Sequence, residues 1–267
     1  MKRFLFCAVF LLAALASVLT PCLQAAEGAE KEYNWYVIRN KEHKQPIFSR
    51  AQKETEKYGA YSIDLLHGDG CDEKTVYLTF DAGYENGNIA KILDILKKEE
   101  TPAAFFILKH LISKEPELVG RMAEEGHLVC NHTMNHKDMT VCSEKEFTDE
   151  LNGLAALYKN TYGREMAKYY RPPEGKYSIK NLQMAKELGY TTVFWSFAYA
   201  DWDNGAQPEP EAAKRKILEN MHNGAVLLLH PTSATNAAIL QDVIRELKAE
   251  GYRFATLDEL TGKCANA

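Results

Sequence analysis

Between residues 76 and 251 the chain alternates short apolar runs with stretches of helical spacing, and this alternation limits the folds that it can adopt. The apolar runs are VYLTF (76–80), AAFFIL (103–108), HLVCN (127–131), TTVFWS (191–196) and AVLLLH (225–230). The other stretches place apolar residues three and four positions apart, and three of them end in glycine, a frequent helix stop. They occupy 89–100, 113–126, 144–160, 179–189 and 237–251.

Such alternation predicts an α/β fold in which helices cover a parallel sheet. The runs lack polar alternation, as expected of strands that are buried on both faces. From the pattern alone, an open doubly wound sheet and a closed barrel are both compatible with the chain.

The first 26 residues, MKRFLFCAVFLLAALASVLTPCLQAA, contain no acidic residue and have the form of a signal peptide. Lys2 and Arg3 form a positive start, residues 4–19 form an apolar run, and Ala25-Ala26 precede a polar chain. The run is slightly short for a membrane span of about 20 residues. We therefore expect cleaved export and no transmembrane segment afterwards, with an uncleaved anchor as the alternative.

Charge and cysteine content narrow the partners and the kinds of site. The net charge is −5 and no run of Lys or Arg occurs, which argues against nucleic acid as a partner. Beyond the predicted signal, four cysteines allow three pairings, and we expect them to be free or partly paired. They are Cys71, Cys130, Cys142 and Cys264. No C-x-x-C pair is present, which argues against a structural zinc cluster.

Polar residues follow the apolar runs directly. Asp81 follows 76–80, His132 follows 127–131, Arg171 follows a Tyr-Tyr pair, and His230 ends the last run. In parallel α/β folds the loops at the carboxyl ends of the strands meet and build the active site. These four residues are therefore predicted to share one site.

His132 and His136 stand four residues apart in HTMNH. On a helix or helical turn this spacing puts both imidazoles on one face, close enough to share a metal ion, and the alternative is a pair of surface histidines. Asp81 precedes a glycine-bearing loop, where it could serve as a general base for water. Its alternative role is to cap a helix that begins near Asn88.

Two further segments could complete such a site. The loop RPPEG (171–175) is stiffened by its prolines and could hold a cation or an oxyanion donor, or be a structural turn. Asp201-Trp202 could supply a carboxylate partner and an aromatic wall for a sugar, or form a packed corner. Together with the histidines and Asp81, these residues suit metal-assisted hydrolysis.

In order, TFDAG (79–83), HTMNH (132–136), RPPEG (171–175), Asp201-Trp202 and LLLH (227–230) resemble the five motifs of the NodB-type polysaccharide deacetylases, carbohydrate esterase family 4. The resemblance implies a distorted (β/α) barrel. It divides the chain into a signal peptide (1–26), an N-terminal extension (27–75), a deacetylase domain (76–262) and a C-terminal tail (263–267).

The flanking sequences are similar to a narrower branch of that family, which removes acetyl groups from N-acetylmuramic acid on the way to the muramic-δ-lactam of spore cortex. They are NWYVIRNKEHKQP (34–46), TFDAGYENG (79–87) and VFWSFAYADW (193–202). The implied protein is an exported monomer that acts on peptidoglycan glycan strands. The alternatives are a deacetylase of N-acetylglucosamine or another polysaccharide, and a glycan-binding relative without catalysis.

The resemblance also implies a role for each motif residue. Asp81 would be the general base and Arg171 would hold it, while His230, paired with Asp201, would be the general acid. His132 and His136 would bind a divalent cation, with Zn²⁺ as the expected ion. The remaining motif residues would contact the substrate or stabilise the oxyanion, the latter through the backbone N–H of Glu174: Pro172, Pro173, Glu174, Trp202 and Leu228.

One motif position departs from the family pattern. Ala82 stands where most members carry an aspartate that is the third protein ligand of the metal. Alanine cannot coordinate a metal, so the resemblance implies a weakened site with only two imidazole ligands.

Overall fold

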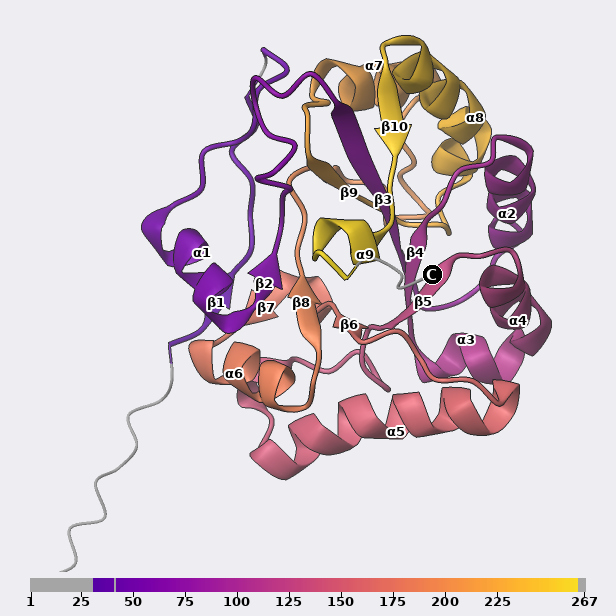
Figure 1. Cartoon of the computed structure of the whole chain (residues 1–267). Helices are drawn as coiled ribbons and strands as arrows, with labels where there is room; N and C mark the ends of the chain where they lie inside the picture. Colours follow the sequence, from indigo (N-terminus) through magenta and orange to yellow (C-terminus); the bar gives the residue numbers. More distant parts are fainter. Residues whose placement is uncertain (1–30, 41, 264–267) are drawn as a thin grey trace, which may run out of the picture.

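The computed structural model describes residues 31–40 and 42–263, most of which form a curled parallel sheet surrounded by helices (Figure 1). The strand order is β10 (Tyr252–Phe254), β3 (Lys74–Ala82), β4 (Ala104–Ile107), β5 (Leu128–Asn131), β6 (Tyr169–Tyr170), β8 (Thr191–Val193) and β2 (Ala60–Tyr61). Along the other edge of β3 lies β9 (Ala225–Leu229), also parallel. A parallel bridge from Phe197 to Leu227 brings the chain after β8 against β9. The sheet thus curls into the distorted (β/α) barrel, and the open-sheet alternative is excluded.

The strands β3, β4, β5, β8 and β9 lie where the apolar runs predicted them, with small differences in length. The largest are at β3, which extends the run 76–80 by two residues at each end, and at β8, which ends at Val193, three residues before the predicted run does. The strands β2, β6 and β10 were not among the predicted runs, because two or three residues are too few to show a period. The same holds for β1 (Tyr33–Asn34), which pairs antiparallel with β7 (Lys176–Tyr177) outside the barrel.

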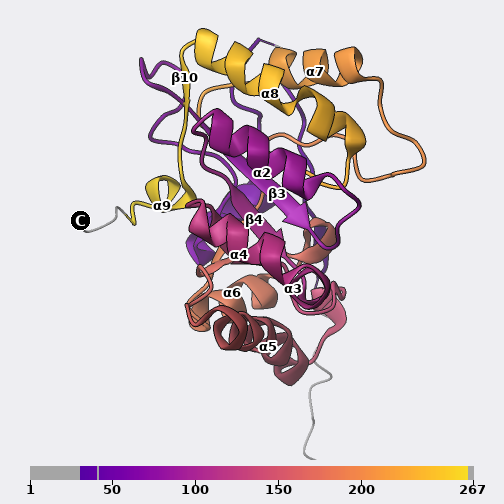
Figure 2. The same cartoon turned by 90° about the vertical axis from the view of Figure 1, so that its right-hand side faces the viewer.

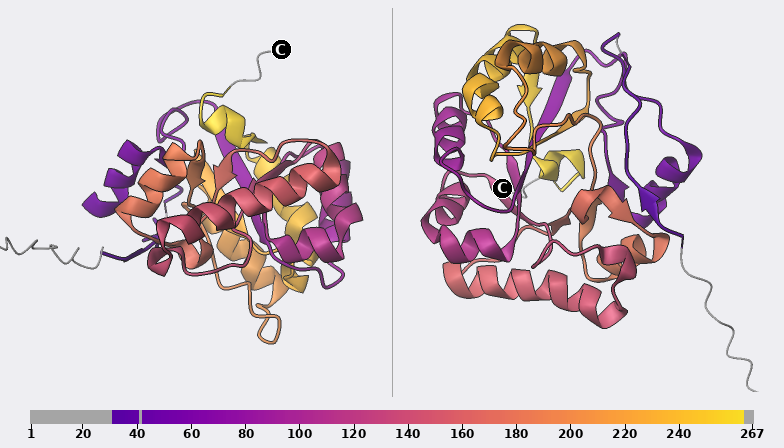
Figure 3. Two further views of the ribbon diagram at one scale, coloured as in Figure 1. Left: turned by 90° about the horizontal axis from the view of Figure 1, so that it is seen from below. Right: turned by 180° about the vertical axis from the view of Figure 1, so that it is seen from behind.

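Helices cover the outer face of the barrel (Figures 2 and 3). Five helices match the predicted helical stretches to within three residues at either end: α2 (Ile89–Lys98), α4 (Pro116–Glu124), α5 (Glu144–Tyr162), α6 (Ile179–Glu187) and α8 (Ala234–Ala249). A capping box of Ser143 and Glu146 starts α5, and left-handed Gly163 ends it.

Within residues 76–262, three α-helices were not predicted: α3 (Lys109–Lys114), α7 (Pro210–Glu219) and α9 (Leu257–Leu260). Half of the residues of α7 are charged and the helix buries only Ala213 and Ile217, so its apolar pattern is weak. In α3 and α9 the chain is too short for a helical period to be evident.

Alternation along β3 separates the inside of the barrel from the outside. Val76, Leu78 and Phe80 pack with the helices, whereas Tyr77 belongs to an inner cluster. That cluster also holds Phe106, Cys130, Val193 and Val226, and Leu257 and Leu260 of α9 pack against it. Because successive side chains of a strand point to opposite faces, Asp81, four residues after Tyr77 on β3, lies on the same inner face.

The segment before β3 packs closely on the barrel. It forms a short helix, α1 (Arg50–Glu54), and its strand β2 pairs with β8. Trp35 is buried and stacks on Phe194, with 4.2 Å between ring centroids. Residues 60–61 are therefore part of the same sheet as the deacetylase motifs.

The sequence also predicts a signal peptide, free or partly paired cysteines and no transmembrane segment after the signal. The predicted signal peptide and Cys264 lie outside the described residues. Within them, Cys71, Cys130 and Cys142 are free thiols. No helix in residues 31–40 and 42–263 has the length and apolar character needed to cross a membrane.

Candidate active site

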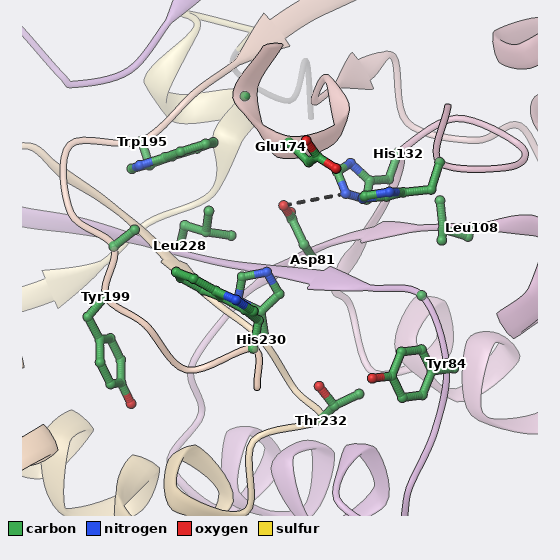
Figure 4. A pocket seen from close by; sticks show the side chains of 15 residues that line it. Asp81, Tyr84, Leu108, His132, Glu174, Trp195, Tyr199, Leu228, His230 and Thr232 are labelled. Atoms are coloured by element: carbon green, nitrogen blue, oxygen red, sulfur yellow. Dashed lines mark ion pairs between the residues drawn. The ribbon is translucent and has the colours of Figure 1, made fainter. Parts of the chain in front are cut away.

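The predicted site residues meet at a cavity of about 780 Å³ at the carboxyl ends of the strands (Figure 4). Seven of the predicted residues line it: Asp81, His132, His136, Glu174, Trp202, Leu228 and His230. The other four, Arg171, Pro172, Pro173 and Asp201, are buried next to residues that line it. The convergence predicted from the strand ends is confirmed.

Arg171 fixes Asp81 in place. Its guanidinium is wholly buried and donates to Asp81 Oδ1 over 2.8 Å, to the carbonyls of Val193 and Phe194, and to Thr79 Oγ1. Every guanidinium nitrogen thus has an acceptor, and the group lies 4.1 Å from the centroid of the Phe106 ring.

The surroundings of Asp81 favour its ionised form. Burial alone would raise the pKa of Asp81, but the charge and hydrogen bond of the Arg171 guanidinium, with the charges of His132 and His230 when these are protonated, outweigh burial and lower that pKa. Asp81 does not cap a helix, because Asn88 precedes α2 and the Glu85 carboxylate accepts from Ile89 N–H. A buried, ionised and fixed carboxylate is suited to accept a proton from water.

The two histidines of HTMNH lie in a loop, and the prediction of a helical turn is wrong. Thr133 and His136 have φ of 72° and 56°, a left-handed conformation that a right-handed turn cannot contain. The loop nonetheless brings the two rings together, with 5.0 Å between their centroids.

His132 is held as a neutral imidazole. Its Nδ1 lies 2.9 Å from the Arg171 carbonyl, which can only accept, so Nδ1 carries the hydrogen and Nε2 has the free lone pair. Nε2 lies 3.6 Å from Asp81 Oδ2. Burial lowers the pKa of His132 to about 4. A neutral imidazole with Nδ1 bonded to a carbonyl is the form that ligates metals.

The donors around these histidines fit a metal ion only in part. Ala82 is fully buried and offers no donor atom. Across residues 31–40 and 42–263, no three His, Cys, Asp or Glu side chains are grouped so that they could hold a metal ion. His132 and His136 can therefore offer two imidazole ligands, one fewer than in typical catalytic zinc sites.

His230 and Asp201 form a second pair on the other side of Asp81. Nδ1 of His230 donates to Asp201 Oδ1 over 2.7 Å, and the His230 backbone N–H donates to Oδ2 over 2.8 Å. Asn236 Nδ2 donates to the same Oδ2. Burial alone would lower the pKa of His230, but the hydrogen bond and charge of Asp201, with the charge of Asp81, raise it overall against the opposing charge of Arg171. His230 is thus helped to stay protonated.

The RPPEG loop forms one wall of the cavity. Glu174 adopts φ 56°, ψ 9° in the turn Pro173–Gly175, and its carboxylate pairs with Lys176 over 3.0 Å. Gly175 follows with φ 68°, in a space where a Cβ would approach Trp195 to 2.7 Å. Opposite, the exposed Trp202 ring lies edge-on to His230, with 6.1 Å between centroids.

Several residues of the site were not predicted. Tyr84, Leu108, Trp195, Tyr199 and Thr232 also line the cavity. Most of them stand within a few residues of a predicted motif, which is the signal that could have indicated them. The supporting residues Thr79 and Asn236 act through hydrogen bonds to Arg171 and Asp201, which no spacing in the sequence reveals.

Comparisons with known proteins agree with this geometry. Residues 69–193 match the polysaccharide deacetylase family. The chain is 38% identical over 256 residues to the peptidoglycan-N-acetylmuramic acid deacetylase PdaA of Bacillus subtilis, covering 95% of this chain and 93% of that protein. It is 31% identical over 192 residues to a peptidoglycan-N-acetylglucosamine deacetylase of Bacillus cereus, covering 71% and 89%.

A solved structure supports the same assignment. The structure of Bacillus subtilis PdaA, a family 4 carbohydrate esterase, matches with a TM-score of 0.82 at 37% identity, covering 87% of this chain and 98% of that one. The cavity, the pairs Asp81–Arg171 and Asp201–His230, and the fold all agree with these comparisons. The chain therefore belongs to the polysaccharide deacetylases of carbohydrate esterase family 4.

Proposed function

We propose that this protein is an exported peptidoglycan deacetylase that hydrolyses the acetamide of N-acetylmuramic acid residues. Family membership makes it a hydrolase of acetamide C–N bonds. The choice of sugar is supported by the match to the N-acetylmuramic acid deacetylase, which is higher in identity and covers more of the chain than the match to the N-acetylglucosamine enzyme. The latter sugar is the second candidate.

The observation that carries the proposal is that a carboxylate with a lowered pKa, Asp81, and an imidazole with a raised pKa, His230, line one cavity. Asp81 would take a proton from water as the water oxygen bonds to the acetyl carbon. The C–N bond would then break as His230 gives its proton to the departing amine, leaving acetate and a free amino sugar. Arg171 and Asp201 would keep the base and the acid in these opposite protonation states.

The His132 and His136 imidazoles would hold a divalent cation, with Zn²⁺ as the first choice. When bound, that cation would polarise the acetamide carbonyl oxygen and so favour attack by water. The backbone N–H of Glu174 is proposed as a further donor to the oxyanion. Pro172 and Pro173 would keep that loop rigid, while Trp202 and Leu228 would contact the sugar or the acetyl group.

The product carries its new amine next to the lactyl carboxyl group of the muramic residue, so that closure to muramic-δ-lactam can follow. We propose that this reaction takes place outside the cytoplasm, on the glycan strands of the spore cortex, and that the protein acts as a monomer. This proposal assigns residues 1–26 to a signal peptide.

Mass spectrometry of glycan strands treated with the purified protein, with and without added Zn²⁺ or Co²⁺, tests the proposal. We expect acetate release and the loss of acetyl groups from muramic residues. Loss from glucosamine residues would support the second candidate. If the protein binds the strands but releases no acetate with any divalent ion, it is a glycan-binding relative, and the proposed catalysis is refuted. Asp81→Asn serves as the inactive control.

A further inference from the structure

The loop that carries both histidines is anchored on α5 by a buried glutamate. Glu150 has an exposed fraction of only 3%. Its Oε2 accepts the backbone N–H of Asn135 over 2.8 Å, and its Oε1 accepts from Asn135 Nδ2 over 2.7 Å. Lys137 Nζ lies 3.4 Å from the same Oε1 and balances the charge. A buried carboxylate is costly unless it is paired in this way.

Two more positions of α5, Leu151 and Gly153, lie against the same loop. Asn131 Nδ2 donates to the Leu151 carbonyl over 2.9 Å, at the start of the loop. Gly153 lies one turn beyond Glu150 on the same helix face, where an added Cβ would come within 3.1 Å of Met134 Sδ. Three residues of α5 thus face the loop: Glu150 with its carboxylate, Leu151 with its carbonyl, and Gly153, which has no side chain to separate the helix from the loop.

The loop needs such support because its backbone conformation is unfavourable. Thr133 and His136 are both left-handed, and neither is glycine, so each costs about 1 kcal/mol or more. Within the loop, Thr133 Oγ1 accepts from His136 N–H over 2.9 Å. Glu150 accepts hydrogen bonds from both the backbone N–H and the side-chain amide of Asn135. Because Asn135 precedes His136 in the chain, these bonds also fix the position of the His136 backbone.

We infer that Glu150 is a positioning residue of the active site, acting through Asn135 to hold His136 beside His132. The inference rests on the proposed function, since it takes these histidines as part of the deacetylase site. Glu150 does not line the cavity, so it acts on the reaction only by way of the loop.

A reciprocal exchange of acid and amide tests the contact. In Glu150→Gln, one acceptor becomes a donor that faces Asn135 Nδ2; in Asn135→Asp, two carboxylates face each other. In the double variant, the amide introduced on α5 can accept the backbone N–H of the loop and donate to the carboxylate introduced there, so the hydrogen bonds are restored. Asp149→Asn is the matched control, because Asp149 neighbours Glu150 on α5 but is exposed and pairs only with Lys145 among the described residues.

The measurements are kcat and KM for acetate release from glycan strands, Tm, and amide exchange of residues 131–138. Each single variant is expected to lower kcat about tenfold or more with KM nearly unchanged, and to speed exchange in this loop. The double variant is expected to recover most of the wild-type kcat and most of the protection of the loop from exchange, as coupled residues do. Asp149→Asn is expected to match the wild type.

The inference is overturned if Glu150→Gln keeps wild-type kcat and loop exchange. It is also overturned if the double variant recovers neither quantity, or if the loss follows a fall in Tm with faster exchange throughout α5. A wild-type protein that releases no acetate refutes the proposed function instead. In that case amide exchange in the loop, compared between the wild type and the four variants, still decides whether Glu150 holds the loop.

Discussion

Asp201 holds His230 at two points, since one carboxylate oxygen accepts from the ring Nδ1 and the other accepts from the backbone N–H of the same residue. The ring can therefore neither rotate nor exchange its tautomer without breaking a bond to a buried carboxylate. This arrangement fixes Nε2 as the atom that can give a proton to a leaving group.

Replacing Asp201 with asparagine should move the pH dependence of the enzyme. The folded-state pKa of His230 is raised, so wild-type activity should fall only as pH rises through a value above the ordinary 6.5. Without the Asp201 charge, Asp81 alone supports the protonated form, while Arg171 opposes it. The alkaline limb of kcat/KM should therefore shift to lower pH, and kcat should drop about 100-fold.

A pH–rate profile of acetate release measures both effects. Asp203→Asn is a suitable control, because Asp203 is exposed and its side chain accepts from the Gly205 backbone. An alkaline limb that stays in place in Asp201→Asn would show that His230 is not the acid.

Arg171→Lys should destabilise the protein as well as inactivate it. Lysine keeps the charge but cannot reach Asp81, Thr79 and two backbone carbonyls at once, so it leaves buried acceptors unpaired. We expect the free energy of unfolding to fall by about 3 kcal/mol. Urea denaturation measures it, with the exposed Arg164→Lys as control; equal stabilities would contradict the role of the guanidinium fork.

Ala82→Asp should tighten the binding of Zn²⁺. The added carboxylate would give the two imidazoles a third partner, for which we expect about a tenfold gain in affinity or more. Because Ala82 is fully buried, the metal-free variant should lose about 2 kcal/mol of stability. Calorimetry with Zn²⁺ and Ala82→Asn as the uncharged control measures the gain, and no gain would contradict the assignment of His132 and His136 as ligands.

Gly175→Ala should distort the wall of the cavity. A Cβ at this position would lie 2.7 Å from the Trp195 ring and 3.0 Å from Trp35 Cβ, and φ of 68° adds strain. We expect a loss of about 2 kcal/mol in the free energy of unfolding. Gly189 has a φ of 81° and open space where a Cβ would lie. Gly189→Ala therefore measures the cost of the backbone conformation without a steric clash. Equal losses in the two variants would show that the tryptophans do not restrict residue 175.

The sequence predicts those parts of the molecule that depend on local pattern. The apolar runs located the long strands, and the ends of those strands located Asp81, His132 and His230, because parallel strands deliver their loops to one edge. The pattern could not reveal the left-handed turns at Thr133 and His136, since both residue types usually avoid that conformation.

Features that depend on distant packing had no signal in the sequence. Glu150 occurs in an amphipathic helix where a glutamate is ordinarily solvated, and only the tertiary fold brings Asn135 against it. The strand β2 is two residues long, and its place at the edge of the sheet follows from its partner β8, not from its own residues.

The pairing of β2 with β8 has a consequence for the order of folding. Ala60 pairs with Thr192, and closing a loop of about 130 residues costs entropy before any contact repays it. The first part of the described chain to leave the ribosome is therefore among the last to find its place. Until β8 has formed, the indole of Trp35 lacks the Phe194 ring that covers it. Before β8 is in place this segment therefore exposes apolar surface, and a partly folded chain of that kind is prone to aggregate.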